Sequence, residues 1–261
     1  MSLKLAIGGK GGVGKTTITG LLARILAQKN EGGRVIAIDA DPVTNLAAAL
    51  GIPEDKPITP ISELSDLIAE RTGAKPGTMG SFFTLNPKVD DIPDRFALER
   101  DGVKLLVMGT VQQGGGGCIC PESTILKALM MHLVLVRDEI VLMDMEAGVE
   151  HLGRATTASV DALLIVVNPG ARSRSAAHRI RKLGVDVGIK RFLVLGNRVR
   201  SKEDEDLIRD DLKDFEIMGF IPEHPQIADA DRQGIRPFED IEDAPDALNQ
   251  LADRLLAIAR K

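Results

Sequence analysis

This chain of 261 residues has no tryptophan and no tyrosine, and its aromatic content rests on seven phenylalanines. A core with so few aromatic rings must be largely aliphatic, as is typical of a parallel sheet covered by helices. Aromatic platforms for stacking single-stranded nucleic acid are equally scarce. An excess of basic residues is also absent, because the formal net charge is −5 and the sequence pI is about 5.5. We therefore expect no nucleic-acid partner.

Long apolar runs are missing as well. No stretch approaches the roughly 18 residues needed to span a bilayer, and the N-terminus leads into a predicted strand without the pattern of a signal peptide. We therefore expect a cytoplasmic protein with no stable membrane association. Residues 244–261 place Leu248, Leu251, Leu255 and Ile258 at helical spacing. Because this stretch carries few cations, we expect a helix docked on the core, with a membrane-targeting helix as the alternative.

Short aliphatic runs alternate with stretches that suit helices along most of the chain. The predicted strands are 3–7, 35–38, 103–108, 140–143, 162–167, 192–195 and 217–221, and the predicted helices are 17–28, 121–136, 173–183 and 203–213. Continuously apolar strands are buried on both faces, so the pattern predicts an α/β fold with one doubly wound, mostly parallel sheet flanked by helices. We expect a single domain over residues 1–261, with an irregular proline-rich insertion at about 51–100 that contains one helix near 61–71.

A glycine-rich loop follows the first predicted strand. Residues 9–16 match the phosphate-loop pattern G-x-x-x-x-G-K-[ST], placed between a strand and a helix as the mechanism requires. The backbone amides of such a loop converge on phosphate oxygens at the positive end of the helix. Lys15 should reach the β- and γ-phosphates, and the Thr16 hydroxyl should coordinate Mg²⁺. The predicted nucleotide-binding residues of the loop are Gly9, Lys10, Gly11, Gly12, Val13, Gly14, Lys15, Thr16 and Thr17.

Lys10 is a second lysine in a loop whose usual cation is already supplied by Lys15. The loop resembles the deviant form G-K-G-G-x-G-K-[ST] of the MinD, ParA and nitrogenase iron protein superfamily of P-loop ATPases. This resemblance implies a homodimer in which Lys10 reaches the partner's nucleotide, as an arginine finger does. Hydrolysis of ATP to ADP and phosphate would then be coupled to dimerisation. A solvated loop lysine is the alternative.

Two acidic segments follow in the order that the superfamily uses. The sequence DADP at 39–42 resembles its switch I element, which implies that Asp41 positions the attacking water and that Asp39 belongs to the Mg²⁺ shell. The sequence DMEAG at 144–148 is similar to the switch II pattern D-x-x-x-G, which implies that Asp144 holds Mg²⁺ through water and that the Gly148 amide senses the γ-phosphate. A carboxylate just past a strand can instead cap a helix. The predicted catalytic residues are Lys10, Lys15, Asp41 and Asp144.

Adenine recognition is predicted near the C-terminal strands. Asn197, at the end of the strand near 192–196, is similar to the base-reading asparagine of the superfamily. Pro222 and Glu223 match the other wall of its adenine site. An asparagine at a strand end can also be a simple turn residue.

The chain has two cysteines, and both lie in the loop GGGGCICPE at 114–122. Residues i and i+2 of an extended segment face the same way, so Cys118 and Cys120 can address one ion. Two sulfurs fill half of a tetrahedral site, and two chains meeting across the phosphate-loop face would complete an S₄ site suited to zinc, nickel or an iron–sulfur cluster. Pro121 suits the first position of the following helix, with Cys120 as its N-cap. A local disulfide and a chance pair of buried cysteines are the alternatives.

The deviant phosphate loop, the two switch segments and the C-x-C loop together resemble the CooC family over essentially the whole chain. Members of this family assist nickel insertion into carbon monoxide dehydrogenase or the related acetyl-CoA synthase. The resemblance implies that Cys118 and Cys120 of two subunits bind nickel, or zinc as a surrogate, and that a nickel enzyme is the client. An iron–sulfur scaffold or electron-transfer ATPase and a MinD- or ParA-like positioning ATPase are the competing hypotheses. The role of His151, just after switch II, stays open.

Overall fold

An eight-stranded sheet forms the centre of the computed structural model, which describes residues 2–30, 34–41, 45–53, 55, 58–77, 82–109, 120–145 and 160–259. The strands are β1 (Leu3–Gly8), β2 (Val35–Asp39), β3 (Leu98–Arg100), β4 (Val103–Val107), β5 (Ile140–Asp144), β6 (Ala162–Val167), β7 (Phe192–Val199) and β8 (Glu216–Pro222). Their order across the sheet is β3-β4-β2-β5-β1-β6-β7-β8. All neighbours pair in parallel except β3 and β4, which are antiparallel. The predicted doubly wound, mostly parallel sheet is confirmed.

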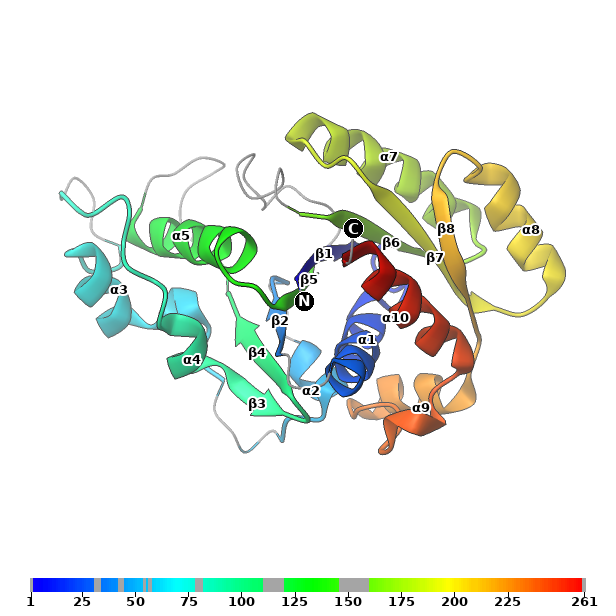
Figure 1. Cartoon of the computed structure of the whole chain (residues 1–261), viewed down its shortest axis with the longest axis horizontal. Helices are drawn as coiled ribbons and strands as arrows, with labels where there is room; N and C mark the ends of the chain where they lie inside the picture. The colour runs from blue at the N-terminus through cyan, green and yellow to red at the C-terminus, as the bar shows by residue number, and fades with distance from the viewer. Residues whose placement is uncertain are drawn as a thin grey trace.

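Helices cover the sheet on two sides, with α1 and α10 on one side and α5 and α7 on the other (Figure 1). The α-helices are α1 (Lys15–Lys29), α2 (Leu46–Leu50), α3 (Ser65–Thr72), α4 (Ile92–Phe96), α5 (Pro121–Leu135), α7 (Ala171–Val187), α8 (Lys202–Asp211), α9 (Pro225–Gln233) and α10 (Asp246–Ala259). Two short 3₁₀ helices, η1 (Ile61–Glu63) and η2 (Ile241–Asp243), complete the described elements.

Side chains that point alternately to the two faces of the sheet divide the core into two layers. In β1, Leu5 and Ile7 belong to the cluster that packs against α1 and α10, whereas Ala6 belongs to the cluster under α5, α7 and α8. Successive side chains of a strand point to opposite faces, so a continuously apolar strand supplies both layers. This explains why the buried strands carry no polar alternation.

The C-terminal helix α10 is docked on the core, as predicted. Leu248, Leu251 and Leu255 are fully buried, and Ile258 packs at the margin of the same cluster. Each buried leucine contributes roughly 1.5–3 kcal/mol relative to an exposed one. The apolar face of α10 is therefore already occupied by the core. Within the described residues, none of the helices has the length and apolarity needed to cross a membrane.

Residues 51–100 contain more regular structure than the sequence predicted. The expected helix is present as η1 and α3, but α4 and the edge strand β3 were not predicted. Strand β3 pairs with β4 from Leu98↔Leu105 to Arg100↔Val103 and so extends the central sheet. The difference arises because β3 has just three residues, none of them fully buried, and therefore no apolar signature.

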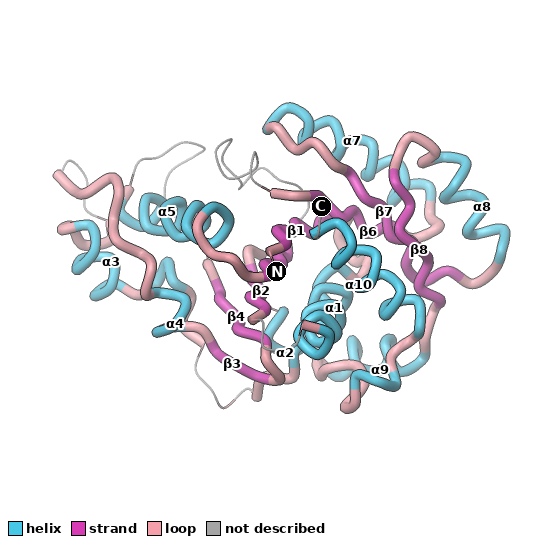
Figure 2. The backbone as a smooth tube through the Cα atoms, in the orientation of Figure 1, coloured by secondary structure: helices cyan, strands magenta, loops and turns pink. Residues whose placement is uncertain are grey.

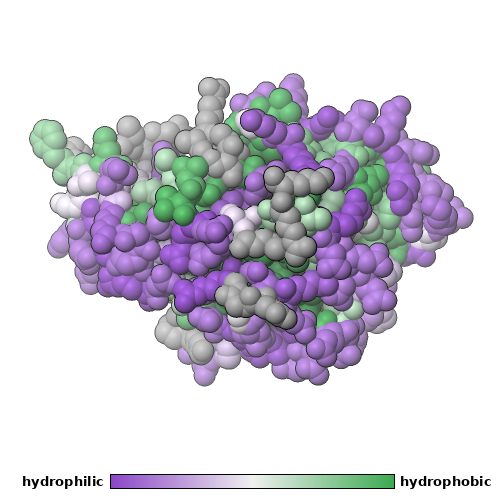
Figure 3. Space-filling model, in the orientation of Figure 1, coloured by the Kyte–Doolittle hydropathy of each residue, from purple (hydrophilic) through white to green (hydrophobic). Residues whose placement is uncertain are grey.

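The order in which strands are added to the sheet changes direction at β1. Strand β1 pairs with β5 on one side and β6 on the other, and the strands beyond each neighbour lead to opposite edges (Figure 2). Ligands of such sheets bind at this switch point, outside the carboxyl ends of the strands. On the face seen in Figure 3 the surface is largely hydrophilic, with apolar side chains gathered over α5, where Met131, Leu135 and Val136 are exposed.

Candidate functional site

The phosphate loop lies at the switch point, between the end of β1 and the start of α1. Gly9, Gly12 and Gly14 have φ angles of 153°, 78° and 92°, which side chains rarely adopt. Space is also limiting, since a Cβ on Gly9 would lie 2.5 Å from the Val166 carbonyl oxygen and one on Gly14 would lie 2.6 Å from Asn197 Nδ2. The loop backbone therefore requires glycine, and it opens the helix with its first amides free to bind an anion.

The two loop lysines occupy different environments. Lys15, the first residue of α1, is 8% exposed, whereas Lys10 lies at the exposed tip of the loop together with Gly11 and Gly12. A buried lysine at the start of the helix is placed to meet phosphates bound by its own loop. The exposed Lys10 at the tip is accessible to solvent.

Asp39 and Asp144 are brought side by side beneath this loop, because β2 and β5 are neighbours and the two residues pair in register. Asp39 is fully buried and Asp144 is 1% exposed. Burial raises the pKa of Asp39 to about 6, although backbone N–H groups of Leu46 and Asp41 oppose the rise. Burial likewise raises the pKa of Asp144 to about 7, with the Thr16 hydroxyl opposing the rise and Asp39 adding to it.

The two carboxylates differ in how their oxygens are used. Asp39 Oδ1 accepts from the Asp41 amide at 3.2 Å, and Oδ2 accepts from the Leu46 amide at 3.1 Å. Among the described residues, neither oxygen of Asp144 meets a hydrogen-bond donor at standard geometry, even though Thr16 lies near enough to affect its pKa. Buried polar atoms are normally paired, so the unpaired oxygens of Asp144 are unusual, whereas those of Asp39 hold the backbone at Asp41 and Leu46.

A cavity of about 610 Å³ opens beside the loop. Its lining combines Gly11, Gly12 and residues 14–17 of the loop with Asp41 and Asn45, and continues through Arg198, Asp231, Ile235 and Pro237. A second cavity of about 390 Å³ shares Arg198 and Asp231 with the first and adds Asn197, Pro222, Glu223 and His224. The residues predicted to read the base, Asn197, Pro222 and Glu223, therefore line one cavity that adjoins the first.

Asn197 is fixed by the phosphate loop itself. It is 4% exposed, and its Nδ2 donates to the Val13 carbonyl oxygen at 2.8 Å. The neighbouring Arg198 has a φ of 57°, at an irregular point in the pairing of β7 with β8. Glu223 is exposed and its carboxylate pairs with Arg200 at 2.7 Å. The roles of Asn197, Pro222 and Glu223 in reading adenine stay predictions.

Residues 230–237 form a wall of the site that sequence reasoning did not find. The wall includes Asp231 of α9, Ile235 and Pro237. The Oδ2 atom of Asp231 lies 3.7 Å from Nη2 of Arg198. Helix α9 buries just one residue, Ala230, so it has no apolar stripe that would have predicted it. Gly234, in the left-handed conformation just past the helix, is the one local signal of its end.

Cys120 is the N-cap of α5, as predicted. Its Sγ accepts from the Ser123 amide at 3.4 Å, its own amide donates to Ser123 Oγ at 3.2 Å, and Pro121 occupies the first helical turn. Because α5 leads from β4 back to the parallel strand β5, its start lies at the carboxyl edge of the sheet, the edge that carries the phosphate loop. Cys118, Gly148 and His151 lie outside the described residues.

A phosphate loop at the switch point of a parallel sheet, with buried carboxylates ending the two adjoining strands, defines a P-loop ATPase. The chain belongs to the CobQ/CobB/MinD/ParA nucleotide-binding domain family, which matches residues 4–238. It is 47% identical over 239 residues to the carbon monoxide dehydrogenase accessory protein CooC of Rhodospirillum rubrum, covering 91% of this chain and 90% of that protein. The resemblance to CooC seen in the motifs is thus confirmed along most of the sequence.

Other relatives support the same assignment. An uncharacterised ATP-binding protein of Methanocaldococcus jannaschii is 49% identical over 223 residues, which are 84% of this chain and 85% of that protein. Among solved structures, a chain of the MinC:MinD cell division protein complex of Aquifex aeolicus superposes with a TM-score of 0.68 at 25% identity, covering 97% of this chain and 95% of that chain. These likenesses agree with the observed sheet order and helix layers.

Proposed function

We propose that this ATPase is a cytoplasmic metallochaperone: a homodimer that binds nickel between its subunits and assists metal insertion into carbon monoxide dehydrogenase or a related nickel enzyme such as acetyl-CoA synthase. The observation that carries the proposal is the position of Cys120, which caps α5 at the sheet edge shared with the phosphate loop. The name of the Rhodospirillum rubrum relative supports the choice of client.

ATP hydrolysis would use the residues gathered at the switch point. Lys15 would hold the β- and γ-phosphates, and Asp41, which lines the cavity, would position the attacking water. Lys10 would reach the nucleotide of the partner subunit from its exposed place at the loop tip. The Gly148 amide would sense the γ-phosphate, in keeping with the switch II resemblance.

The donor set fits Mg²⁺, which prefers oxygen ligands and keeps several waters. Thr16 supplies a hydroxyl, and Asp144 supplies two buried carboxylate oxygens that have no donor among the described residues. Asp144 is a stronger candidate than Asp39, because both oxygens of Asp39 already accept backbone hydrogen bonds. The ion would neutralise charge on the phosphates while the protein residues fix their positions.

Nickel would be the cargo of this cycle. Cys118 and Cys120 of one subunit supply half of a tetrahedral site, and nucleotide-driven pairing of two subunits would supply four thiolates. Hydrolysis would then open the dimer and release the ion to the client enzyme. Zinc would fill the same site as a surrogate, because it also accepts tetrahedral sulfur ligands.

The test is nickel titration followed by gel filtration of the ADP- or ATP-loaded protein. The wild type should bind about one nickel per dimer, and the double variant Cys118→Ser, Cys120→Ser should lose tight nickel binding while keeping its nucleotide affinity. Serine is a good N-cap, so the double variant should keep the start of α5. Tight nickel binding by this variant would rule out the cysteine site. A brown protein with visible charge-transfer absorption after anaerobic purification would instead favour an iron–sulfur scaffold.

A positioning ATPase is the second candidate, and one observation favours it: the septum site-determining protein MinD of Thermotoga maritima is 30% identical over 237 residues, covering 87% of this chain and 77% of that protein. The packed apolar face of α10 argues for the chaperone instead. Nucleotide-dependent sedimentation with anionic lipid vesicles would distinguish the two candidates.

A further inference from the structure

Residues 234–240 join α9 to η2 without forming a helix or strand of their own, yet they complete the wall of the nucleotide cavity. Gly234, Ile235 and Pro237 line the cavity beside the phosphate loop. Phe238 turns back into the core, where it is 6% exposed, and its ring meets the His224 ring edge-on at a centroid distance of 5.1 Å. Because His224 lines the adjoining cavity with Asn197, this segment lines one cavity and packs against a residue that lines the other.

The backbone conformation of residues 234–240 is unfavourable without contacts to the rest of the fold. Phe238 has a φ of 59°, in the left-handed region that bulky side chains avoid. Backbone carbonyls in a segment without regular structure also need hydrogen-bond donors from elsewhere. Contacts from other parts of the fold must therefore hold the segment in place.

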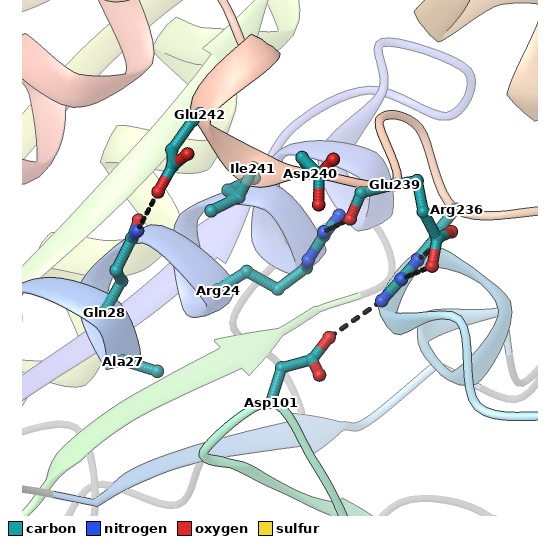
Figure 4. A pocket seen from close by; sticks show the side chains of 9 residues that line it. All are labelled: Arg24, Ala27, Gln28, Asp101, Arg236, Glu239, Asp240, Ile241 and Glu242. Carbon is teal, nitrogen blue, oxygen red and sulfur yellow. Dashed lines mark hydrogen bonds and ion pairs between the residues drawn. The ribbon is translucent and has the colours of Figure 1, made fainter.

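Arg24 supplies those contacts. This residue lies on α1, the helix that the phosphate loop opens, and is 5% exposed. Its Nη1 donates to the carbonyl oxygens of Pro237 at 3.1 Å and Phe238 at 2.8 Å, and its Nη2 donates to that of Glu239 at 2.7 Å. Figure 4 shows Arg24 reaching from α1 toward Glu239.

A second arginine, Arg236, also holds residues 234–240 in place, through ion pairs. Arg236 pairs with Glu239 within the segment and with Asp101, at the turn between β3 and β4, at 2.7 Å (Figure 4). Arg24 differs from Arg236 in that it binds backbone and comes from the phosphate-binding helix. The wall and the phosphate loop are thus attached to the same helix, about two and a half turns apart.

We propose that Arg24 is a positioning residue for the nucleotide: by holding the carbonyls of residues 237–239, it fixes the wall at 234–237 against the phosphate loop and so sets the affinity for the nucleoside part of ATP. Arg24 itself lines neither of the two cavities assigned to the nucleotide. Removing the Arg24 side chain should therefore lower the affinity for the nucleoside part of ATP and leave phosphate binding by the loop unchanged. A guanidinium suits this role because its fixed fork presents several donors at once.

The chain offers a matched control in Lys4. This lysine is 3% exposed and its Nζ also donates to two backbone carbonyls, those of Arg137 and Glu139, both at 2.7 Å. It lies near the amino end of β1, at the edge of the sheet opposite the nucleotide site. Lys4→Met and Arg24→Met both remove a buried cation that binds backbone carbonyls, so both should lower thermal stability.

The experiment compares the binding of a fluorescent ADP analogue with that of pyrophosphate, which probes the phosphate loop alone. Arg24→Met should raise the Kd for ADP about tenfold and leave the Kd for pyrophosphate within about twofold. The KM for ATP should rise while kcat at saturating ATP stays within about twofold of the wild type, because no reacting group is lost. Arg24→Lys should give intermediate ADP affinity, and Lys4→Met should bind both probes as the wild type does.

Three results would overturn the proposal: wild-type ADP affinity in folded Arg24→Met, equal losses of ADP and pyrophosphate affinity, or an equal loss of ADP affinity in Lys4→Met. Should Arg24→Met fail to fold, Arg24→Lys is examined by hydrogen exchange with and without ADP. Faster exchange at residues 235–240 together with weaker ADP binding supports the assignment. Unchanged exchange and unchanged binding there reject it.

Discussion

Asp39 and Asp144 are register partners at the carboxyl ends of β2 and β5, and both are almost completely removed from solvent. Two carboxylates held next to each other in this way are unfavourable unless a proton or a cation is shared with them. The strain shows in the pKa values of about 6 for Asp39 and about 7 for Asp144, which burial raises above the usual value of 3.8, with the charge of Asp39 adding to the rise at Asp144. The strain also makes the pair receptive to a bound cation.

The pH dependence of stability follows from these shifts. A carboxyl whose folded-state pKa lies above its unfolded value of 3.8 binds its proton more tightly when folded, so its contribution to stability falls as pH rises from about 4 through 7. In EDTA and without nucleotide, Asp144→Asn should raise the Tm at pH 8 by about 2–4 °C and raise it by a smaller amount at pH 5. Differential scanning calorimetry at the two pH values measures this. Asp91→Asn is the control, because Arg95 lowers the pKa of Asp91 and its loss should not raise the Tm.

In-trans catalysis by Lys10 predicts complementation between two inactive variants. Lys10→Ala lacks the cation offered to its partner, and Asp144→Asn lacks a carboxylate needed in its own site, so each homodimer should be about 10²-fold slower in ATP hydrolysis. A heterodimer of the two has one complete site. Equal mixtures should therefore recover up to about one quarter of the wild-type rate if both variants pair freely. A mixture no faster than either variant would show that Lys10 does not act across subunits.

Base selectivity should depend on the hydrogen bond between Asn197 and Val13. A carbonyl oxygen can only accept, so the Asn197 amide group must face Val13 and its Oδ1 is left to accept from the exocyclic amine of adenine. Asn197→Asp would place a carboxylate against that carbonyl. We expect about a tenfold loss of ATP affinity and a smaller preference for ATP over GTP, measured by competition binding. Asn168→Ala, at the end of the neighbouring strand β6, should keep the wild-type preference.

Two substitutions at Cys120 distinguish its role as the N-cap of α5 from its proposed role as a metal ligand. Cys120→Ser keeps an acceptor for the Ser123 amide, whereas Cys120→Ala leaves that amide without its cap. The alanine variant should be less stable than the serine variant by about 0.5–2 kcal/mol in urea unfolding. Both variants should lose tight nickel binding. Nickel binding retained by the serine variant alone would point to an oxygen ligand at this position and against a thiolate site.

Local patterns predicted the scaffold of this site well. The run at 140–143 is apolar throughout, which is typical of a strand buried on both faces in the interior of a parallel sheet. The glycines and lysines at 9–16 likewise predict a phosphate loop, and the loop has φ angles at Gly9 and Gly14 that other residues rarely adopt. Pro121 after Cys120 predicted the start of α5 for the same kind of local reason.

The sequence by itself determined the phosphate loop, the parallel strands and the residues that end them, since each follows from a backbone preference or a burial pattern within a few neighbouring residues. Tertiary structure alone decided the rest of the nucleotide site. The three-residue strand β3 pairs with β4. The wall at 234–237 is held by Arg24, more than 200 positions earlier, which donates to the carbonyl oxygens of residues 237–239. Such contacts leave no periodic trace in the chain, because their energy comes from partners that are distant in sequence.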